Sequence, residues 1–449
     1  MTKFLSKFLI PVLILTLGLF LRTHSLSSLA PFDWDQNRDY QEVSKIVSGK
    51  PTLIGPVARG EGGFFLGPLY YYLLTPLYTI TGGNPISLPL TSVLLDSLTI
   101  VLILGFGAYL KKPNFGYIFA MLYAVSPSVI DSARISWNVI LVPLWFITTM
   151  YYLSKPKYSD LELFLGGVLA ASTWHIHAAL IPLAALLMLF KARSLSIFSP
   201  RILFIIVGDI IPLSPLILFD IRHVGLQSNL IMQMVVGQES VKEPLLAVTH
   251  SALARYGKNL TMFFGGKSDL NTIVGILGLS LSILMLFSKN MIFRLASFSI
   301  IANLCLVIIL GVASFPEYYL LTATIATVLI ISVLLSQSRL GTVFSLVLSL
   351  YLLSKINFAP SPYGLENKLK LARRIAQETS EASIIYDLPF GRDSGIPLLV
   401  KREGVNTHDS SKNLFMISEK NDSNLFIRGE LATELGYYGA FRLVKHEIK

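Results

Sequence analysis

The sequence is poor in cysteine and in charged residues. Cys305 is the single cysteine of the 449-residue chain, so no disulfide can form within it. Charged residues make up 14% of the chain, against the ~25% that is usual in soluble domains. No Walker or Rossmann glycine fingerprint is present, so the sequence carries no motif for a nucleotide. The low charge already argues against an ordinary soluble domain.

Long apolar runs take the place of the missing charge. Hydrophobic residues make up 53% of the chain, and its mean hydropathy is +0.62. The apolar residues fall in runs of about 15–25, which cross a ~30 Å hydrocarbon core as helices because backbone groups in lipid must bond internally. The sequence predicts an all-α polytopic membrane protein with about eleven transmembrane helices in the lipid bilayer. We place these helices at residues 8–22, 86–110, 114–130, 137–153, 160–174, 176–190, 202–219, 270–287, 295–313, 317–335 and 340–356.

The basic residues of the short loops set the predicted orientation. The net charge is +10, and lysines and arginines recur in the short loops on one side of the predicted bundle. Such an excess marks the cytoplasmic side and contacts with lipid headgroups, so it is no argument for a nucleic-acid partner. The N-terminus is then cytoplasmic, and the long loops 23–85 and 220–269 lie outside. Residues 28–30 resemble a signal-peptide cleavage site, but the proline that follows favours an uncleaved anchor.

Two parts of the chain differ in composition. Residues 1–356 hold the predicted spans, whereas residues 357–449 are rich in charge, serine, asparagine and glycine. Apolar residues remain too frequent there for a disordered tail, so we expect a small extracytoplasmic α/β domain. Helical spacing predicts a helix over 364–380. Strand-like runs are Ser383–Tyr386, Ile396–Lys401, Leu414–Ser418 and Leu425–Arg428, and segment 64–81 is expected to be an interfacial helix.

A charged cluster follows the first predicted span. Residues 33–39 read Asp-Trp-Asp-Gln-Asn-Arg-Asp, and no other segment of the first 110 residues is as polar. Ordering three carboxylates and an arginine at a membrane surface is costly unless they bind or react. Asp33 and Asp35 are therefore the candidate catalytic residues, and Arg38 and Asp39 are candidate substrate ligands. An ion pair on the surface of a helix is the structural alternative for Arg38 and Asp39.

A second motif follows this cluster. After the acidic segment 33–40, residues 67–73 read Gly-Pro-Leu-Tyr-Tyr-Tyr-Leu, and a proline-bearing return span comes next. This order resembles the C-type membrane glycosyltransferases (GT-C), in particular the bacterial relatives of protein O-mannosyltransferases and aminoarabinose transferases. The resemblance implies a GT-C fold and a sugar donor carried on a polyprenyl phosphate. By position, Asp35 matches the catalytic aspartate of the family, and Arg38 matches the arginine that follows it.

Two positions depart from the family pattern. Gln36 stands where glutamate is usual, and Gly67 stands where lysine is common. One expected partner of the donor phosphate is therefore missing. Lys50, Arg59 and Arg134 are the candidates to replace it.

A single displacement at the sugar fits these residues. The acceptor must lose a proton as the new bond forms, and one carboxylate can take it. The leaving phosphate gains charge, so a cation should lie beside it. We therefore expect an inverting glycosyltransferase that moves a sugar from polyprenyl phosphate to a hydroxyl or amine of a glycan, lipid or protein at the outer face of the membrane. Most relatives work without metal, so no cofactor is expected; a divalent metal between Asp33 and Asp35 is the alternative.

Further candidate substrate-binding residues lie near the predicted outer ends of the spans. Arg134 and Asn138 flank the start of one span, and His177 follows a polar turn between two others. The remaining candidates are Arg59, Glu61, Tyr70, Arg222, His223 and Glu317. Each has a structural alternative, such as a helix-terminal charge, a snorkelling side chain or a solvated loop.

Other functions remain open at this point. A transporter or lipid flippase would place ionisable groups at mid-membrane, as Asp96 and Asp209 are, and would usually show repeated halves. No internal repeat is visible, and the polar clusters gather at one predicted face, which favours an enzyme. A polysaccharide ligase or polymerase, and a noncatalytic assembly subunit with the same fold, are further alternatives.

Overall fold

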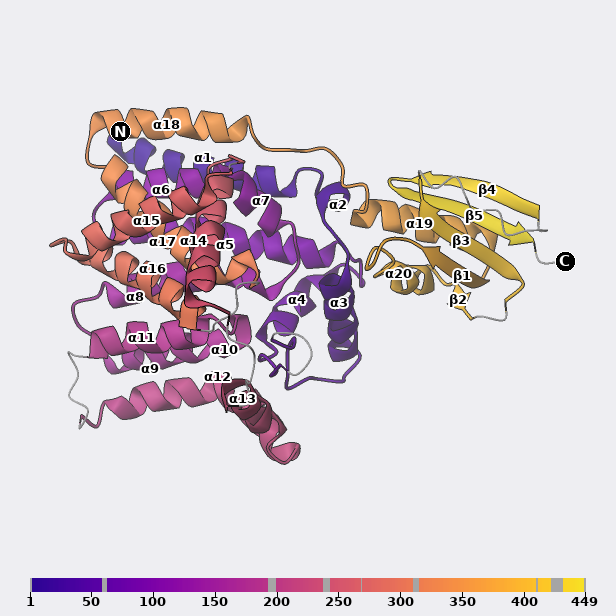
Figure 1. Cartoon of the computed structure of the whole chain (residues 1–449), viewed down its shortest axis with the longest axis horizontal. Helices are drawn as coiled ribbons and strands as arrows, with labels where there is room; N and C mark the ends of the chain where they lie inside the picture. Colours follow the sequence, from indigo (N-terminus) through magenta and orange to yellow (C-terminus); the bar gives the residue numbers. More distant parts are fainter. Residues whose placement is uncertain are drawn as a thin grey trace.

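The protein consists of a bundle of helices and a small α/β domain beyond one end of the bundle (Figure 1). The computed structural model describes residues 2–58, 63–192, 199–236, 243–267, 269–309, 315–408, 411–420 and 431–447. The N-terminus lies at the end of the bundle opposite to the α/β domain. Three short helices, α2 (Leu26–Leu29), α3 (Trp34–Val47) and α4 (Leu69–Ile80), lie at the same end as that domain.

The remaining helices up to residue 353 make up the bundle and its connections. They are α1 (Thr2–Thr23), α5 (Ser87–Tyr109), α6 (Pro113–Val125), α7 (Pro127–Ala133), η1 (Asn138–Ile140), α8 (Leu141–Leu153), α9 (Asp160–Ala171), α10 (Thr173–Ile176), α11 (Leu180–Ala192), α12 (Ile202–Arg222), α13 (Leu226–Val236), α14 (Leu245–Phe263), α15 (Asn271–Leu286), α16 (Met291–Ile309), η2 (Glu317–Leu320), α17 (Leu321–Leu335) and α18 (Arg339–Leu353).

Each of the segments predicted to span the membrane contains a helix. Among the described residues, four helices are long and apolar enough to cross a membrane: α5, α12, α16 and the continuous η2–α17. The pair α6–α7 forms a fifth if it is one span, bent by 66°. Shorter apolar helices occupy other predicted spans, among them α1, α8 and α18. The expectation of a helical protein with several membrane-spanning helices is confirmed, and the count of about eleven stays a prediction.

The structure corrects the expectation of a long loop over residues 220–269. α12 continues to Arg222, and α13 and α14 follow in the described part of this segment. α14 packs closely on α15: a Cβ added at Gly257 would lie 1.7 Å from the carbonyl oxygen of Asn271. Glycine therefore lets the two backbones approach. Hydropathy alone misses α14 because its arginine, lysine and histidine side chains interrupt the apolar stripe.

The C-terminal domain is built on a mixed five-stranded sheet. Its strands are β1 (Glu381–Asp387), β2 (Asn406–Thr407), β3 (Asn413–Glu419), β4 (Leu431–Tyr438) and β5 (Phe441–Glu447). Their order is β2-β1-β3-β5-β4, with β1 parallel to β2 and β3, and with β5 antiparallel to β3 and β4. The helix α19 (Leu365–Glu378) buries Leu365, Leu371, Ala372 and Ile375. The expected α/β character is confirmed.

Some expectations for this domain were wrong. The run 396–401, expected as a strand, forms the helix α20 (Ile396–Arg402). Gly395 precedes it with φ of 82°, and Pro397 lies in its first turn, where proline suits a helix. A short apolar run does not distinguish a strand from a buried helical turn. The strands β4 and β5 were not predicted, and the run expected at 425–428 lies outside the described residues.

A buried ion pair ties α1 to α5 and α6. The Nε of Arg22 lies 2.6 Å from Oδ2 of Asp96, and the hydroxyl of Tyr123 donates to Oδ1 of Asp96 at 2.5 Å. Arg22 also donates to the carbonyl oxygen of Ala124 at 2.9 Å. Hydrogen bonds satisfy both charges, as a buried pair requires. This gives Asp96 a structural role.

A buried lysine joins the C-terminal domain to the start of α3. The ammonium of Lys368 on α19 donates to the carbonyl oxygens of Phe32 (2.9 Å) and Ser394 (2.7 Å) and to Oδ1 of Asp33 (2.8 Å). The Lys368 side chain is 0% exposed, and burial lowers its pKa despite the attraction of Asp33. The backbone N–H of Leu365 donates to the carbonyl oxygen of Ala30 alongside. The domain is therefore docked on the segment that begins α3.

We expect Lys368→Met to loosen this docking. The substitution keeps the length of the side chain but leaves the Asp33 carboxylate and two carbonyl oxygens without their donor, at a cost of ~3 kcal/mol. The Tm of the purified protein should fall, and limited proteolysis should cut sooner in the connection between α18 and α19. Lys370→Met, at an exposed lysine of the same helix, is the control. Equal Tm and cleavage in both variants would contradict the docking role.

Candidate active site

The helix α3 positions the charged cluster. Its first turn is fixed by Gln36, whose side chain accepts from the backbone N–H of Asp33 at 3.0 Å and donates to the carbonyl oxygen of Ser136 at 2.7 Å. Gln36, Asp39, Tyr40 and Val43 form the buried face of the helix. With a period of 3.6 residues, Asp35 and Arg38 then lie together on one flank of that face.

Arg38 binds two carboxylates that differ in burial. Its Nη1 lies 2.7 Å from Oδ1 of Asp35, and its Nη2 lies 2.6 Å from Oδ1 of Asp39. The Asp39 side chain is 0% exposed, whereas that of Asp35 is 53% exposed. Burial raises the pKa of Asp39 to about 7, although the charge of Arg38 acts in the opposite direction. Asp39 anchors the arginine, and Asp35 stays accessible.

Asp35 lines a small polar cavity at this end of the bundle. The cavity has a volume of about 130 Å³. Three other predicted site residues, Arg38, Asn138 and His177, line it as well. The ring of His177 packs edge-on against Tyr319 with centroids 4.7 Å apart, and Asn138 donates to the carbonyl oxygen of Ile176 at 2.5 Å. The other lining residues are Pro56, Val57, Ala58, Leu66, Trp137, Val139, Ala178, Tyr318 and Tyr319.

A second, mostly apolar cavity adjoins the polar one. Its volume is about 300 Å³, and it shares Trp137, Val139 and Tyr318 with the polar cavity. Its other lining residues are Asp96, Tyr123, Ser128, Val129, Asp131, Ser132, Ile135, Ile140, Pro143, Asn259, Met262, Phe263, Glu317, Leu321, Thr324 and Ile325. A polar space, lined in part by α3, and an apolar space thus adjoin at the three shared residues.

Known structures resemble the fold of this protein over almost the whole chain. ArnT from Cupriavidus metallidurans bound to undecaprenyl phosphate aligns with 97% of this chain and 97% of its own, at a TM-score of 0.62 and 11% identity. The apo form of that enzyme aligns over the same shares, at a TM-score of 0.50 and 10% identity. The oligosaccharyltransferase of Archaeoglobus fulgidus aligns with 91% of this chain and 68% of its own, at 13% identity and a TM-score of 0.46, too low to add to the argument. No family model and no curated protein sequence matches the chain.

The protein has a GT-C fold. The resemblance stated from the sequence is confirmed at the level of the fold, and it extends over the C-terminal domain as well as the bundle. At 11% identity, residues of ArnT cannot be matched one by one to residues of this chain. The roles of the site residues therefore rest on the geometry of this chain.

Two cations that bind Glu317, a lining residue of the apolar cavity, were not predicted from the sequence. Lys258 on α14 lies 2.8 Å from Oε1 of Glu317, and Nη1 of Arg255 lies 3.4 Å from the same oxygen. Asn259 donates to the backbone carbonyl of Glu317 at 2.8 Å. Arg255 and Lys258 are three residues apart and so share a face of α14. That spacing was the available signal, but it has meaning only once the segment is known to be helical.

Other predicted site residues lie outside the two cavities. Asp33 is held by Lys368, away from Asp35, and Tyr70 is buried with its hydroxyl 2.9 Å from those of Ser92 and Ser136. Arg134 is buried and donates to the carbonyl oxygen of Leu21 at 2.8 Å. None of these side chains lines the polar or the apolar cavity.

The last predicted site residues lie at the end of α12 or outside the described residues. Arg222 ends α12, and His223 stacks on Phe219 with ring centroids 4.1 Å apart. Arg59 and Glu61 lie outside the described residues. Within the described ranges, no three His, Cys, Asp or Glu side chains are grouped as a metal site would need.

Asp39 makes stability depend on pH in a defined direction. Its pKa in the folded protein, about 7, lies above the ordinary ~3.9, so the folded state keeps a proton that the unfolded chain loses. Its contribution to stability therefore falls as the pH rises from about 4 to about 7. The Tm of the wild-type protein should fall relative to that of Asp39→Asn between about pH 5 and pH 7.5. Parallel pH profiles of the two proteins would contradict the raised pKa.

Proposed function

We propose that the protein is an inverting glycosyltransferase that moves a sugar from a polyprenyl-phosphate carrier to a hydroxyl or amine acceptor at the outer face of the membrane. The observation that carries this proposal is that the two cavities adjoin at Trp137, Val139 and Tyr318. An accessible carboxylate, Asp35, lines the polar one, and the apolar one is lined by residues from several bundle helices. A substrate with a charged head and an isoprenoid tail needs such a pair of spaces.

The apolar cavity suits the part of the donor next to the phosphate. Met262, Phe263, Leu321 and Ile325 offer it hydrocarbon surface. Burial of isoprene units there is favourable by ~25 cal/mol for each Å² removed from water. ArnT, which shares the fold, has been solved with undecaprenyl phosphate, and this supports a donor of the same class.

Arg255 and Lys258 are suited to the donor phosphate. Both lie at Glu317, which lines the apolar cavity, and two cations against one carboxylate leave a net positive charge there. The phosphate gains charge as the bond to the sugar breaks, and a guanidinium fork matches its oxygens. These residues supply the cation that Gly67 does not.

Asp35 is the proposed base. In the displacement, the acceptor oxygen or nitrogen bonds to the anomeric carbon while the bond from that carbon to the phosphate oxygen breaks. The proton of the acceptor goes to Asp35, and the electron pair of the broken bond leaves with the polyprenyl phosphate. One attack from the face opposite to the leaving group inverts the anomeric centre. Arg38 orients the carboxylate of Asp35 through the contact at 2.7 Å.

The proposed orientation puts this site outside the cytoplasm. The cavity residues Asp35 and Arg38 belong to α3, which lies at the end of the bundle opposite to the N-terminus (Figure 1). The excess of basic residues in the short loops assigns the N-terminal side to the cytoplasm. Both α3 and the C-terminal domain are then extracytoplasmic, where a lipid-linked donor removes the need for a nucleotide sugar.

A transporter is the weaker alternative. Its best sequence support was Asp96 and Asp209 in predicted spans. Asp96 is neutralised by Arg22 and accepts a hydrogen bond from Tyr123 within the bundle, which accounts for its presence without a transported ion.

We expect Asp35→Asn to abolish transfer while the protein still folds. Loss of the base should lower turnover by ~10²–10⁴-fold, whereas binding of undecaprenyl phosphate should be unchanged. The measurement is mass spectrometry of envelope glycans from a deletion strain that carries each variant. Glu42→Gln removes another carboxylate of α3 outside the polar cavity and should restore the wild-type glycan. Normal glycans with Asp35→Asn would remove this residue from the mechanism.

We expect Arg255→Gln to weaken donor binding. The loss of one charge-assisted contact should raise the Kd for undecaprenyl phosphate by about tenfold. Native mass spectrometry of the purified protein with added undecaprenyl phosphate measures this. Arg201→Gln is the matched control, because Arg201 is also ion-paired, to Asp160 at 2.7 Å, but precedes α12 and lines neither cavity. Equal affinity of the two variants would exclude the phosphate role of Arg255.

A further inference from the structure

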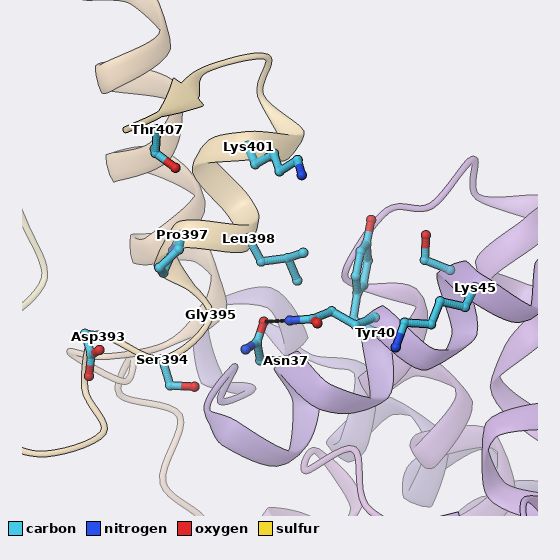
Figure 2. A pocket seen from close by; sticks show the side chains of 12 residues that line it. Asn37, Tyr40, Lys45, Asp393, Ser394, Gly395, Pro397, Leu398, Lys401 and Thr407 are labelled. Atoms are coloured by element: carbon cyan, nitrogen blue, oxygen red, sulfur yellow. Dashed lines mark hydrogen bonds between the residues drawn. The ribbon is translucent and has the colours of Figure 1, made fainter. Parts of the chain in front are cut away.

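A third hollow lies on the other flank of α3, between this helix and α20 of the C-terminal domain. Figure 2 shows the side chains that line it. We call it the α3–α20 cleft; its volume is about 620 Å³, more than that of either cavity described above. From α3 it is lined by Asn37, Tyr40, Gln41, Ser44 and Lys45, and from the C-terminal domain by Asp393, Ser394, Gly395, Pro397, Leu398, Lys401 and Thr407.

Helical periodicity separates this cleft from the polar cavity. The five α3 residues of the cleft stand at i, i+3, i+4, i+7 and i+8, which is one continuous stripe. Asp35 lies on the other flank of the helix, beyond the buried Gln36, Asp39 and Val43. Among the residues that the structure describes, none lines both the cleft and the polar cavity. One helix therefore serves two separate hollows.

The two walls of the cleft are held at a fixed distance. Lys368 binds both Asp33, which precedes α3, and Ser394, which lines the cleft. The rings of Trp34 and Phe390 pack with centroids 4.9 Å apart. Arg402 at the end of α20 donates to the carbonyl oxygen of Gly83 at 3.3 Å. The cleft is thus a preformed feature of the docked domain.

The lining chemistry suits a saccharide. Amides and hydroxyls from both walls offer donors and acceptors, and Pro397 and Leu398 offer a small apolar surface for a sugar ring. Gln41 donates to Asn37 at 3.3 Å along the α3 wall of the cleft. Polar groups beside a small apolar patch thus match the hydroxyls and the ring face of a sugar.

The charges of the cleft favour an acidic substituent on that saccharide. Lys45 and Lys401 extend into the space between the walls (Figure 2). Lys45 is bonded to Glu42 at 2.6 Å, whereas Lys401 is exposed and has no ion pair within the described ranges. Asp393, the one carboxylate among the described lining residues, lies on the part of the C-terminal wall away from Lys45. An anionic group would therefore sit at the lysine end.

We propose that the α3–α20 cleft binds an acidic saccharide, one that carries a carboxylate or phosphate, as the acceptor side of the transfer. The assignment as acceptor rests on the proposed function. A helix with its side chains is ~10–12 Å across, so a chain of a few sugars reaches from the cleft around α3 to Asp35. The C-terminal domain then selects the acceptor, and α3 carries both its binding stripe and the base.

Isothermal titration calorimetry of the full chain in detergent tests the binding. Trigalacturonate is the acidic probe, and maltotriose is the neutral one. Trigalacturonate should bind, and Lys401→Gln should weaken its binding about tenfold through loss of a charge-assisted contact. Lys370→Gln, at an exposed lysine of α19 that pairs with Glu366, should bind like the wild type.

A steric variant locates the bound saccharide. Ser44→Trp should fill the cleft and abolish binding of trigalacturonate. Val47→Trp adds the same ring at an exposed position of α3 outside the lining and should keep it. Absence of binding to the wild type, or equal binding by these two variants, would overturn the proposal. Equal affinity for maltotriose would overturn the acidic part, and equal affinity for inorganic phosphate would overturn the saccharide.

Binding and transfer can fail separately. Asp35→Asn should bind trigalacturonate as the wild type does, because Asp35 does not line the cleft. If that variant still transfers sugar while Ser44→Trp abolishes saccharide binding, the proposed base is wrong and the cleft stands. If Asp35→Asn abolishes transfer while trigalacturonate never binds, the proposed function stands and the cleft is excluded.

Discussion

The contact of Lys368 with three oxygens is the interaction on which the arrangement of the site depends. It joins the C-terminal domain, through Ser394, to Phe32 and Asp33 at the start of α3. A buried ammonium is stable only when its donors are used, so the three partners are held in one geometry. The same contact withdraws Asp33 from the site and fixes where α3 begins. The polar cavity and the α3–α20 cleft both depend on that position, because α3 forms a wall of each.

The period of the helix α3 then places neighbouring residues in different environments. Asp35 and Asp39 are both bonded to Arg38, yet one is exposed and the other is fully buried. The buried carboxylate holds the arginine, and the exposed one is left to meet a substrate. Residues one or two positions away in the sequence, Gln36 and Asn37, point to the core and to the cleft. A dense charged segment thus becomes three surfaces with different chemistry.

Much of the site could be predicted from the sequence, and the limits have physical causes. The cluster at 33–39 stood out because charge is scarce elsewhere, and Asp35, Arg38, Asn138 and His177 do line one cavity. Arg255 and Lys258 could not be predicted as site residues, because the charged side chains of α14 lower its hydropathy and make the segment look like a loop. The spacing of Asp33 and Asp35 suggested a pair. Asp33 is instead the N-cap of α3 and binds Lys368, which lies 335 residues further along the chain. Run length alone could not separate the helix α20 from a strand.

Charged groups are paired to different degrees in the bundle and beside α3. In the bundle, the Arg22–Asp96 pair is closed by Tyr123 and by backbone carbonyls, so the interior keeps no uncompensated charge there. Beside α3, Lys368 and Asp39 are also buried and bonded, but three other charges are held less tightly: Glu317 is shared by two cations, Asp35 is half exposed, and Lys401 is exposed. Charges that are fully paired stabilise a fold, whereas charges with a weak or shared partner can exchange it for a ligand. Beside α3, the exposed Asp35 and Lys401 and the shared Glu317 are therefore the charges that a substrate can reach.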